Sequence, residues 1–282
     1  RGFSAPVILD RETDNAERAF LLAHDTDPFC KWEAGRALAR DVLLKMLNEG
    51  AAPDKAFLGA LSSTLADDSL DPAFVALVLA LPSEDDLAQA QVDAGLVPDP
   101  QAIHAVRERM RDAMAEALED QLRAAYAAHQ VPGPYRPDAD AAASRALANT
   151  ALMLLSRRDG GALAQTQYDA ADNMTQQLAA LSALLTADAG DDALKAFEAQ
   201  WKDDRLVMDK WFSLQVAHAE PGDTAATVER LTRHPAFTMK NPNRFRAVFG
   251  AFAMNQAGFH HDSGDGYRLM ADWLIKLDAL NP

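Results

Sequence analysis

The chain has 282 residues, 49% of them apolar, which is enough for one or two domains with a sizeable core. Its 27 basic and 42 acidic side chains give a net charge of −15, which argues against a nucleic-acid-binding protein and against binding to an anionic membrane surface. The single cysteine, Cys30, excludes a disulfide within the chain and a thiolate zinc cluster. One cysteine fits a reducing compartment, so we expect a cytoplasmic protein.

Helix starts are marked in the same way along the chain. An Asp or Asn that can cap a helix is followed by Pro, which suits the first helical position, at Asp27-Pro28, Asp71-Pro72, Asp99-Pro100 and Asn241-Pro242. Asp14 with Glu17, and Ser83 with Asp86, have the spacing of a capping box. The one strand candidate, residues 5–9, is either irregular or completes a sheet of a preceding domain.

These signals and the apolar spacing predict a series of helices. We expect them over 14–24, 28–48, 53–65, 72–81, 84–91, 100–130, 139–157, 162–170, 174–186, 192–203, 205–218, 224–233, 242–255 and 265–279. The segment 100–130 carries one apolar stripe and would form a helix about 45 Å long. The stripe consists of Ile103, Val106, Met110, Met114, Leu118, Leu122 and Tyr126.

Short connections between so many helices favour an all-α fold. We predict an irregular α-superhelix of stacked helical hairpins, as in HEAT and armadillo solenoids, with a globular multi-helix bundle as the alternative. A membrane span is not expected, because the longest uncharged apolar run, 72–82, is about half the length that a span needs.

Catalytic and metal-binding motifs are not found in the sequence, so we predict no catalytic residue and no metal ligand in this chain. No His is followed by Glu, as a zinc peptidase helix requires, and no phosphate-binding loop is present. His24, His104, His129 and His218 are isolated from other histidines. A lone His on a helix is more often a capping or core residue than a ligand.

One segment, 255–267, is dense in polar residues. His260, His261, Asp262 and Asp265 could in principle hold a metal ion, but adjacent side chains in an extended stretch point apart. We therefore favour a connection between two helices, in which Asp262 or Asp265 caps the second helix.

Arg244 and Arg246 open the helix predicted after Asn241. Cations are disfavoured at a helix N-terminus, so these arginines should meet carboxylates. The partner is either an internal carboxylate of the fold or the carboxylate of a ligand.

Several stretches together resemble the C-terminal helical domain of the bacterial aminopeptidase N family of zinc aminopeptidases. They are residues 206–212 (LVMDKWF), 237–244 (FTMKNPNR), 250–253 (GAFA), Phe259-His260 and 264–267 (GDGY). The resemblance implies that residues 1–9 end a preceding β-sandwich domain and that 10–282 form the C-terminal α-superhelical domain. It also implies truncation at the C-terminus, because family members continue with further helices past the position of Asn281-Pro282.

The resemblance further implies a function for the whole protein, namely zinc-dependent removal of N-terminal amino acids from peptides. This domain would cap the active-site chamber and control peptide access, with no chemistry of its own. Its partners would be the catalytic and β domains of the same polypeptide and the peptide substrates. The family's zinc-binding motif is absent here, so the zinc would be bound outside this chain.

Five residues are candidates for the substrate channel or the domain interface: Asn241, Arg244, Arg246, Phe259 and His260. Two rival interpretations remain. The chain could be a free-standing α-solenoid scaffold that binds other proteins, or a self-contained hydrolase.

Overall fold

The computed structural model describes residues 13–280, and every regular element in this range is a helix. The first part of the chain contains α1 (Asn15–His24), α2 (Pro28–Glu49), α3 (Lys55–Leu65), α4 (Pro72–Val78), α5 (Glu84–Asp93), α6 (Pro100–Ala117), α7 (Glu119–Ala128) and α8 (Ala139–Asp159). The second part begins with α9 (Ala162–Ala170), α10 (Met174–Thr186), α11 (Asp191–Trp201), α12 (Arg205–Ala217), the short η1 (Pro221–Asp223) and α13 (Thr224–Thr232). It ends with α14 (Pro242–Phe245), the π-helical η2 (Arg246–Gly250), α15 (Ala251–Met254), α16 (Gln256–Phe259) and α17 (Asp265–Asp278).

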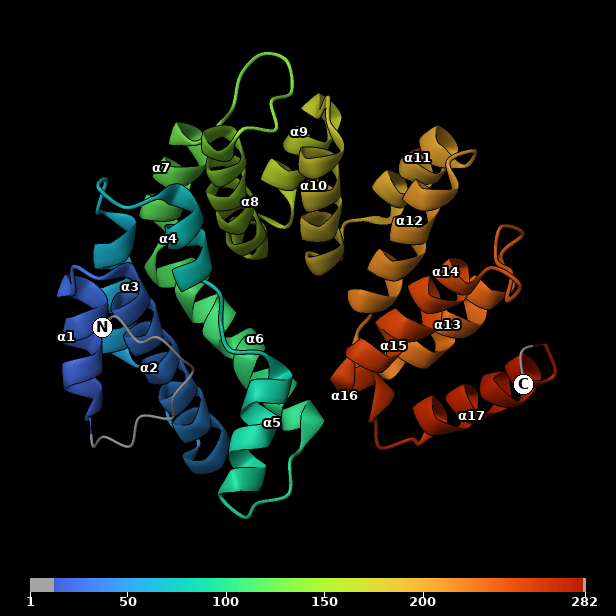
Figure 1. Ribbon diagram of the computed structural model, residues 1–282, viewed down its shortest axis with the longest axis horizontal. Coiled ribbons are helices and arrows are strands. Elements are labelled where there is room, and N and C mark those ends of the chain that lie inside the picture. Colours follow the sequence, from blue (N-terminus) through green and yellow to red (C-terminus); the bar gives the residue numbers. More distant parts are fainter. Residues whose placement is uncertain (1–12, 281–282) are drawn as a thin grey trace, which may run out of the picture.

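The helices form an arch rather than a compact bundle (Figure 1). Helices that follow one another in the chain pack together, as α1 does on α2, α7 on α8 and α9 on α10. In Figure 1 the arch runs from α1 through α8 and α10 to α17, and α6 approaches α16 from the opposite side. The all-α superhelix predicted from the sequence is therefore confirmed.

Two hydrophobic cores succeed each other along the chain. The first contains buried side chains from α1 to α8, among them Leu38, Phe57 and Met110. The second runs from α8 to α15 and includes Phe197, Phe212 and Phe252. Since α8 contributes Leu155 to the first core and Leu152 to the second, it joins the two. A globular bundle would share one core, whereas a solenoid buries its apolar faces between successive neighbours.

The predicted helix caps are present. The side chains of Asp27, Asp71, Asp99 and Asn241 each accept a backbone N–H in the first turn of the helix that follows. Ser83 and Asp86 form a reciprocal capping box at the start of α5. Each such cap satisfies N–H groups that have no partner within the helix, which is why these sequence signals locate helix starts well.

The prediction of one continuous helix over 100–130 was wrong. The chain leaves the helical conformation at Leu118, with φ −113° and ψ 11°, so that α6 and α7 are separate. The apolar stripe is nevertheless buried, because six of its residues lie in the first core and Tyr126 packs against it. The break lets α6 pack against α2 and α5 while α7 packs against α3 and α8.

The predicted helix over 242–255 is also interrupted, by the π-helical turn η2. Within this turn three consecutive residues, Ala247, Val248 and Phe249, are buried. Single π-helical turns of this kind occur inside α-helices, where they widen the helix locally. No residue pattern in the sequence indicates this local change of period.

Some predictions concern residues outside the described range. The end of a β-sandwich over residues 1–9 and the strand candidate within it lie there, as does the Asn281-Pro282 terminus. Within the described part of the chain, every helix is too short or too polar to cross a membrane.

Candidate functional site

Arg244 is buried, with 4% of its surface exposed, and its charge is used inside the fold. Its guanidinium pairs with the carboxylate of Asp209 and donates to the backbone carbonyl of Arg205 at 3.1 Å. It also lies 4.7 Å from the centre of the Phe212 ring. The internal ion pair, one of the two alternatives that the sequence left open, is what the structure shows for Arg244. The guanidinium thus has its partners within the fold, and a part for Arg244 in the substrate channel or the domain interface stays a prediction.

The other candidates near Arg244 have different surroundings. Asn241 caps α14 by accepting the N–H of Asn243 at 3.1 Å. Arg246 is exposed at the start of η2, and no ion pair of its side chain is found within residues 13–280. The structure thus leaves Arg246 alone of the two arginines free to meet a carboxylate from outside the described chain.

Phe259 and His260 lie together at the end of α16. Phe259 packs edge-on against Phe252 and Tyr267, and His260 Nδ1 is 2.6 Å from the Tyr267 hydroxyl oxygen. Among the described residues, no three His, Cys, Asp or Glu side chains are grouped so that they could hold a metal ion. The segment 255–267 is a connection between helices, with the short α16 inside it.

The expected capping of α17 by Asp262 or Asp265 was wrong. Gly264, with φ 71°, occupies the N-cap position and supplies no side-chain cap. Instead the Ser263 hydroxyl accepts the N–H of Asp265 at 3.3 Å, and the Asp265 carboxylate pairs with Arg268. The left-handed conformation at Gly264 turns the chain so that Ser263 reaches the helix start.

A cleft of about 1010 Å³ lies between the α5–α6 part of the chain and the segments around the end of α12 and the start of α16. One wall consists of residues from α5, α6 and α8, and the other of the residues that follow α12 and of the α15–α16 junction. A second hollow of about 550 Å³ adjoins it and is lined by His260 and Tyr267. The two hollows share Glu84, Asp85 and Gln256, so they form one continuous recess. Of the five sequence candidates, only His260 lines it.

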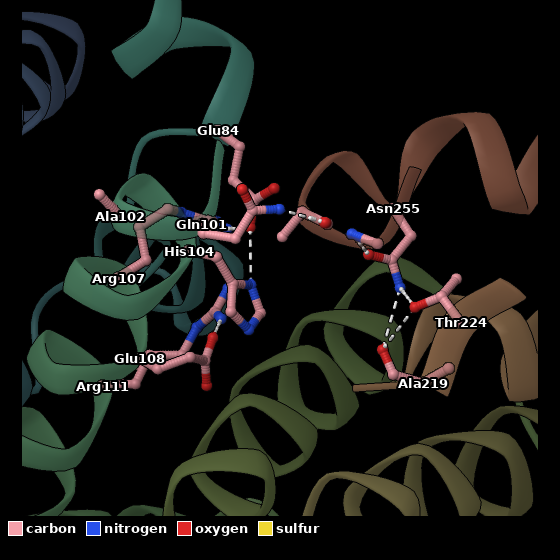
Figure 2. A network of polar contacts seen from close by, with 12 residues as sticks. Glu84, Gln101, Ala102, His104, Arg107, Glu108, Arg111, Ala219, Thr224 and Asn255 are labelled. Atoms are coloured by element: carbon pink, nitrogen blue, oxygen red, sulfur yellow. Dashed lines mark hydrogen bonds and ion pairs between the residues drawn. The ribbon is translucent and has the colours of Figure 1, made fainter. Parts of the chain in front are cut away.

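The α6 wall of the cleft carries a network of ion pairs (Figure 2). Glu84, at the start of α5, accepts hydrogen bonds from His104 Nδ1 at 3.0 Å and from Arg107 Nη1 at 3.2 Å. Arg107 also donates through Nε to the carbonyl of Pro82 at 2.9 Å. Three groups from two helices thereby fix one another's orientation.

A second set of ion pairs continues the network along α6 towards α8. Glu108 pairs with Arg111 on its own helix and accepts from Arg157 of α8 at 2.8 Å. Arg157 Nε donates in turn to Asp112 at 2.7 Å. The arginines of this wall are therefore largely neutralised by carboxylates of the same domain.

The network shifts the ionisation of its members. Burial alone would raise the pKa of Glu84, but the hydrogen bond from His104 and the charge of Arg107 outweigh it and lower the pKa. The hydrogen bond to Glu84 raises the pKa of His104, and burial opposes this only in part. His104 and Glu84 thus stabilise each other as a charged pair.

The opposite wall depends on Asn255. Its amide nitrogen donates to the carbonyls of Val216 and Ala219, both at 3.0 Å, and its side-chain oxygen accepts the N–H of Gly258 at 3.0 Å. These bonds join the end of α12 to α16 (Figure 2). Close by, His218 caps the C-terminal end of α12 and also lines the cleft.

Sequence reasoning missed the cleft residues Glu84, Arg107, Glu108 and Arg111, and it regarded His104 and His218 as isolated. Glu84 lies on the helix before α6 and His218 follows α12, far along the chain, so no local motif marks the residues as one site. The one available signal was the position of Arg107, Glu108 and Arg111 off the apolar stripe of α6, and such a pattern normally indicates only a solvated face.

Comparison with known proteins agrees with this architecture. A family model described as a domain of unknown function (DUF3458_C) with ARM repeats matches residues 15–282. The chain belongs to this family. As a DUF3458_C domain it is 41% identical, over 100% of its length, to aminopeptidase N of Caulobacter vibrioides. It is 35% identical to aminopeptidase N of Escherichia coli over 99% of its length.

The DUF3458_C domain is a part of these relatives. It covers 33% of each of the two aminopeptidase N chains and corresponds to their C-terminal part. A solved structure, that of Legionella pneumophila aminopeptidase A in complex with aspartic acid, matches 100% of this chain and 34% of its own, with a TM-score of 0.87 and 29% identity. The resemblance to aminopeptidase N is therefore confirmed.

Proposed function

We propose that this DUF3458_C domain is the C-terminal superhelix of a zinc-dependent aminopeptidase that removes N-terminal amino acids from peptides. The domain caps the active-site chamber of that enzyme and controls which peptides enter, while the bond cleavage takes place in other domains of the same polypeptide. The observation that carries the proposal is the similarity to aminopeptidase N over the whole chain, of which the chain covers a third. The single cysteine supports a cytoplasmic location.

The metal belongs to the proposal for the whole protein only. In hydrolysis of this kind zinc polarises the scissile carbonyl and activates a water molecule. A catalytic zinc needs three protein ligands, and no group of three metal-ligating side chains is found among residues 13–280. The described residues do not fit a zinc site, so no step of the reaction is assigned to them.

The cleft supports a role in access. Its α6 wall is held by ion pairs and its opposite wall by Asn255, so the recess is kept open by groups that are already satisfied. A peptide entering it would meet a preformed surface with both polar and apolar side chains, without having to break an apolar core. Preorganised surfaces of this kind bind and orient ligands at low entropic cost.

Filling the cleft tests the role in access. Met254 lines it and is 70% exposed, while Leu206 is equally exposed, at 70%, but does not line it. In the full-length polypeptide, Met254→Trp should lower kcat/KM for a hexapeptide severalfold and leave an aminoacyl nitroanilide unaffected. Leu206→Trp, the matched control, should change neither. Equal loss of activity on both substrates, or no loss from Met254→Trp, would contradict access control.

The activity itself needs a separate test. The full-length polypeptide should release N-terminal residues from peptides and lose this activity with a chelator, whereas the chain of residues 1–282 alone should release none. An inactive full-length polypeptide, or one whose remaining sequence holds no His-Glu-x-x-His motif, would contradict the proposal and favour a protein-binding scaffold. Turnover by the isolated chain would favour a self-contained hydrolase.

The proposal also assigns Arg246 a role in binding a carboxylate. Its exposed guanidinium, free of ion pairs within the described residues, would meet the C-terminal carboxylate of a peptide or a carboxylate of a neighbouring domain. For the peptide role, Arg246→Ala in the full-length polypeptide should raise KM for a peptide more than for its C-terminal amide. Equal effects on the two substrates would remove this role.

A further inference from the structure

Two polar side chains on opposite walls of the cleft have hydrogen-bonding capacity left over, beside neighbours that are fully engaged. Arg107 and Arg157 are both bound to carboxylates and to backbone carbonyls, and Asn255 uses both ends of its amide. Arg111 on α6 and His218 at the end of α12 each make a single side-chain hydrogen bond within the described residues. Both line the cleft.

Arg111 has unused donors in a fixed position. An arginine side chain carries several N–H donors, and here only Nη1 is engaged, with the carboxylate of Glu108. Glu108 is itself held by Arg157 at 2.8 Å, so the direction of the Arg111 guanidinium is set by two other helical residues. About a third of the Arg111 side chain, 34%, remains exposed to the cleft. Arg109, by contrast, is exposed and makes no such bond.

His218 presents an unused acceptor. Its Nδ1 lies 3.2 Å from the hydroxyl oxygen of Thr186, and that hydroxyl donates its only proton to the carbonyl of Ser182 at 3.0 Å. In this arrangement Thr186 accepts from His218, which places the proton on Nδ1. Nε2 is left as an unprotonated acceptor, with no hydrogen-bond partner among the described residues.

The neutral form of His218 is favoured by its surroundings. Burial lowers its pKa, and the charge of Arg111 lowers it further, with Glu108 opposing only in part. The lone pair on Nε2 is therefore kept at neutral pH.

The charges around the pair select a neutral ligand group. A carboxylate is disfavoured, because Glu108 already neutralises Arg111 and Glu220 lines the same cleft. On the α6 wall, an ammonium group would have to compete with Arg111 and Arg157 for the Glu108 carboxylate. A peptide group carries no charge, and it offers a carbonyl oxygen to a donor and an N–H to an acceptor.

We propose that Arg111 and His218 form a subsite for the peptide backbone, in which Arg111 donates to a carbonyl and His218 accepts an N–H. The subsite extends the proposed function, on which it rests, by stating which groups of the domain hold the peptide on its way through the cleft. It predicts recognition of the main chain without preference for particular side chains.

Equilibrium binding tests the subsite without turnover. The probe is fluorescein-labelled hexaalanine amide, and its anisotropy is followed with the full-length polypeptide in the presence of a chelator. Arg111→Met and His218→Phe should each raise Kd about fivefold, the effect of one lost hydrogen bond. Arg123→Met on α7 and His129→Phe, just after the end of α7, are matched controls outside the cleft and should leave Kd unchanged.

A series of altered ligands makes the test independent of folding. In each ligand one peptide bond is replaced by an ester, which removes a single N–H. At one of these positions the ester should raise Kd for the unaltered protein about fivefold. The same ester should cause no further rise in Kd with the His218→Phe variant. Equal binding of all esters, or unchanged Kd in both cleft variants, would overturn the subsite. A full-length polypeptide that binds the probe in this way but releases no amino acid would instead overturn the proposed function alone.

Discussion

Gln101, in the first turn of α6, donates a 2.6 Å hydrogen bond to the carbonyl oxygen of Ala257 in α16, 156 positions later in the chain. Helix α6 belongs to the first core, and α16 packs against the second through Phe259. Figure 2 shows Gln101 reaching from one wall of the cleft towards the segment that starts at Asn255. The bond therefore links a helix of the first core to a helix that packs on the second.

Removing this bond should loosen the arch. We expect Gln101→Ala to lower the free energy of unfolding by about 1 kcal/mol, measured by urea denaturation, and to speed hydrogen exchange in α16. Gln89→Ala is the matched control, because Gln89 bonds only to Asp93 on the exposed face of its own helix. Equal stability of the two variants would show that the contact with Ala257 contributes nothing.

The buried pair of Arg244 and Asp209 should matter far more than an exposed pair. Arg244→Met leaves the Asp209 carboxylate without its main partner, so we expect a loss of about 3 kcal/mol in the free energy of unfolding. Arg233→Met removes an exposed pair with Glu229 and should cost less than about 0.5 kcal/mol. Adding Asp209→Leu to Arg244→Met should recover part of the loss. A small loss of unfolding free energy in Arg244→Met would mean that water solvates the carboxylate in place of Arg244.

Two glycine substitutions should act in opposite directions. A Cβ on Gly258 would come within 2.2 Å of the Thr224 hydroxyl oxygen, so Gly258→Ala should destabilise the fold by about 2 kcal/mol. A Cβ on Gly59, in the exposed face of α3, meets nothing within 4 Å. Gly59→Ala should therefore stabilise the protein by up to about 1 kcal/mol. Thermal unfolding measures the stability change in each variant. Stability changes of the same sign in the two variants would contradict the steric argument.

The His104–Glu84 pair should stabilise the protein most at low pH. The pKa of His104 is higher in the folded chain than its usual value of 6.5, so the folded state holds the proton more tightly. The resulting stability is complete below pH 6.5 and is lost as the pH rises through the folded pKa. His104→Leu should therefore cost more at pH 5.5 than at pH 8.5 in urea unfolding. An equal cost at both pH values would mean that His104 acts without its charge.

His218 should show the opposite dependence. Its pKa is lowered from 6.5 by burial and by Arg111, so the unfolded chain binds the proton more readily than the folded chain. Stability is then lost as the pH falls below 6.5 towards the folded pKa. His218→Gln removes this loss, so the variant should gain stability relative to the unaltered chain between pH 7.5 and pH 5.5. A constant difference across this range would contradict the neutral form inferred for His218.

The local part of the fold could be predicted from the sequence. Caps such as Asp27, Asp71 and Asp99 act on N–H groups two or three residues away, so the residues that mark a helix start are neighbours in the chain. The breaks at Leu118 and at Arg246–Gly250 could not be predicted, since each arises from the packing of helices that are distant in sequence. For the same reason, the sequence could not decide which carboxylate pairs with the buried Arg244.

The sequence by itself determined the helical class, the helix starts, the apolar stripe of α6 and the likeness to aminopeptidase N, because all of these depend on residues close together in the chain. Only the tertiary structure decided which polar groups meet. His104 pairs with Glu84 of the preceding helix. Arg111 and His218 line the same cleft, because the arch brings α6 opposite the end of α12. Ion pairs and hydrogen bonds act over a few ångströms in space, and no local pattern records which helices a superhelix brings that close.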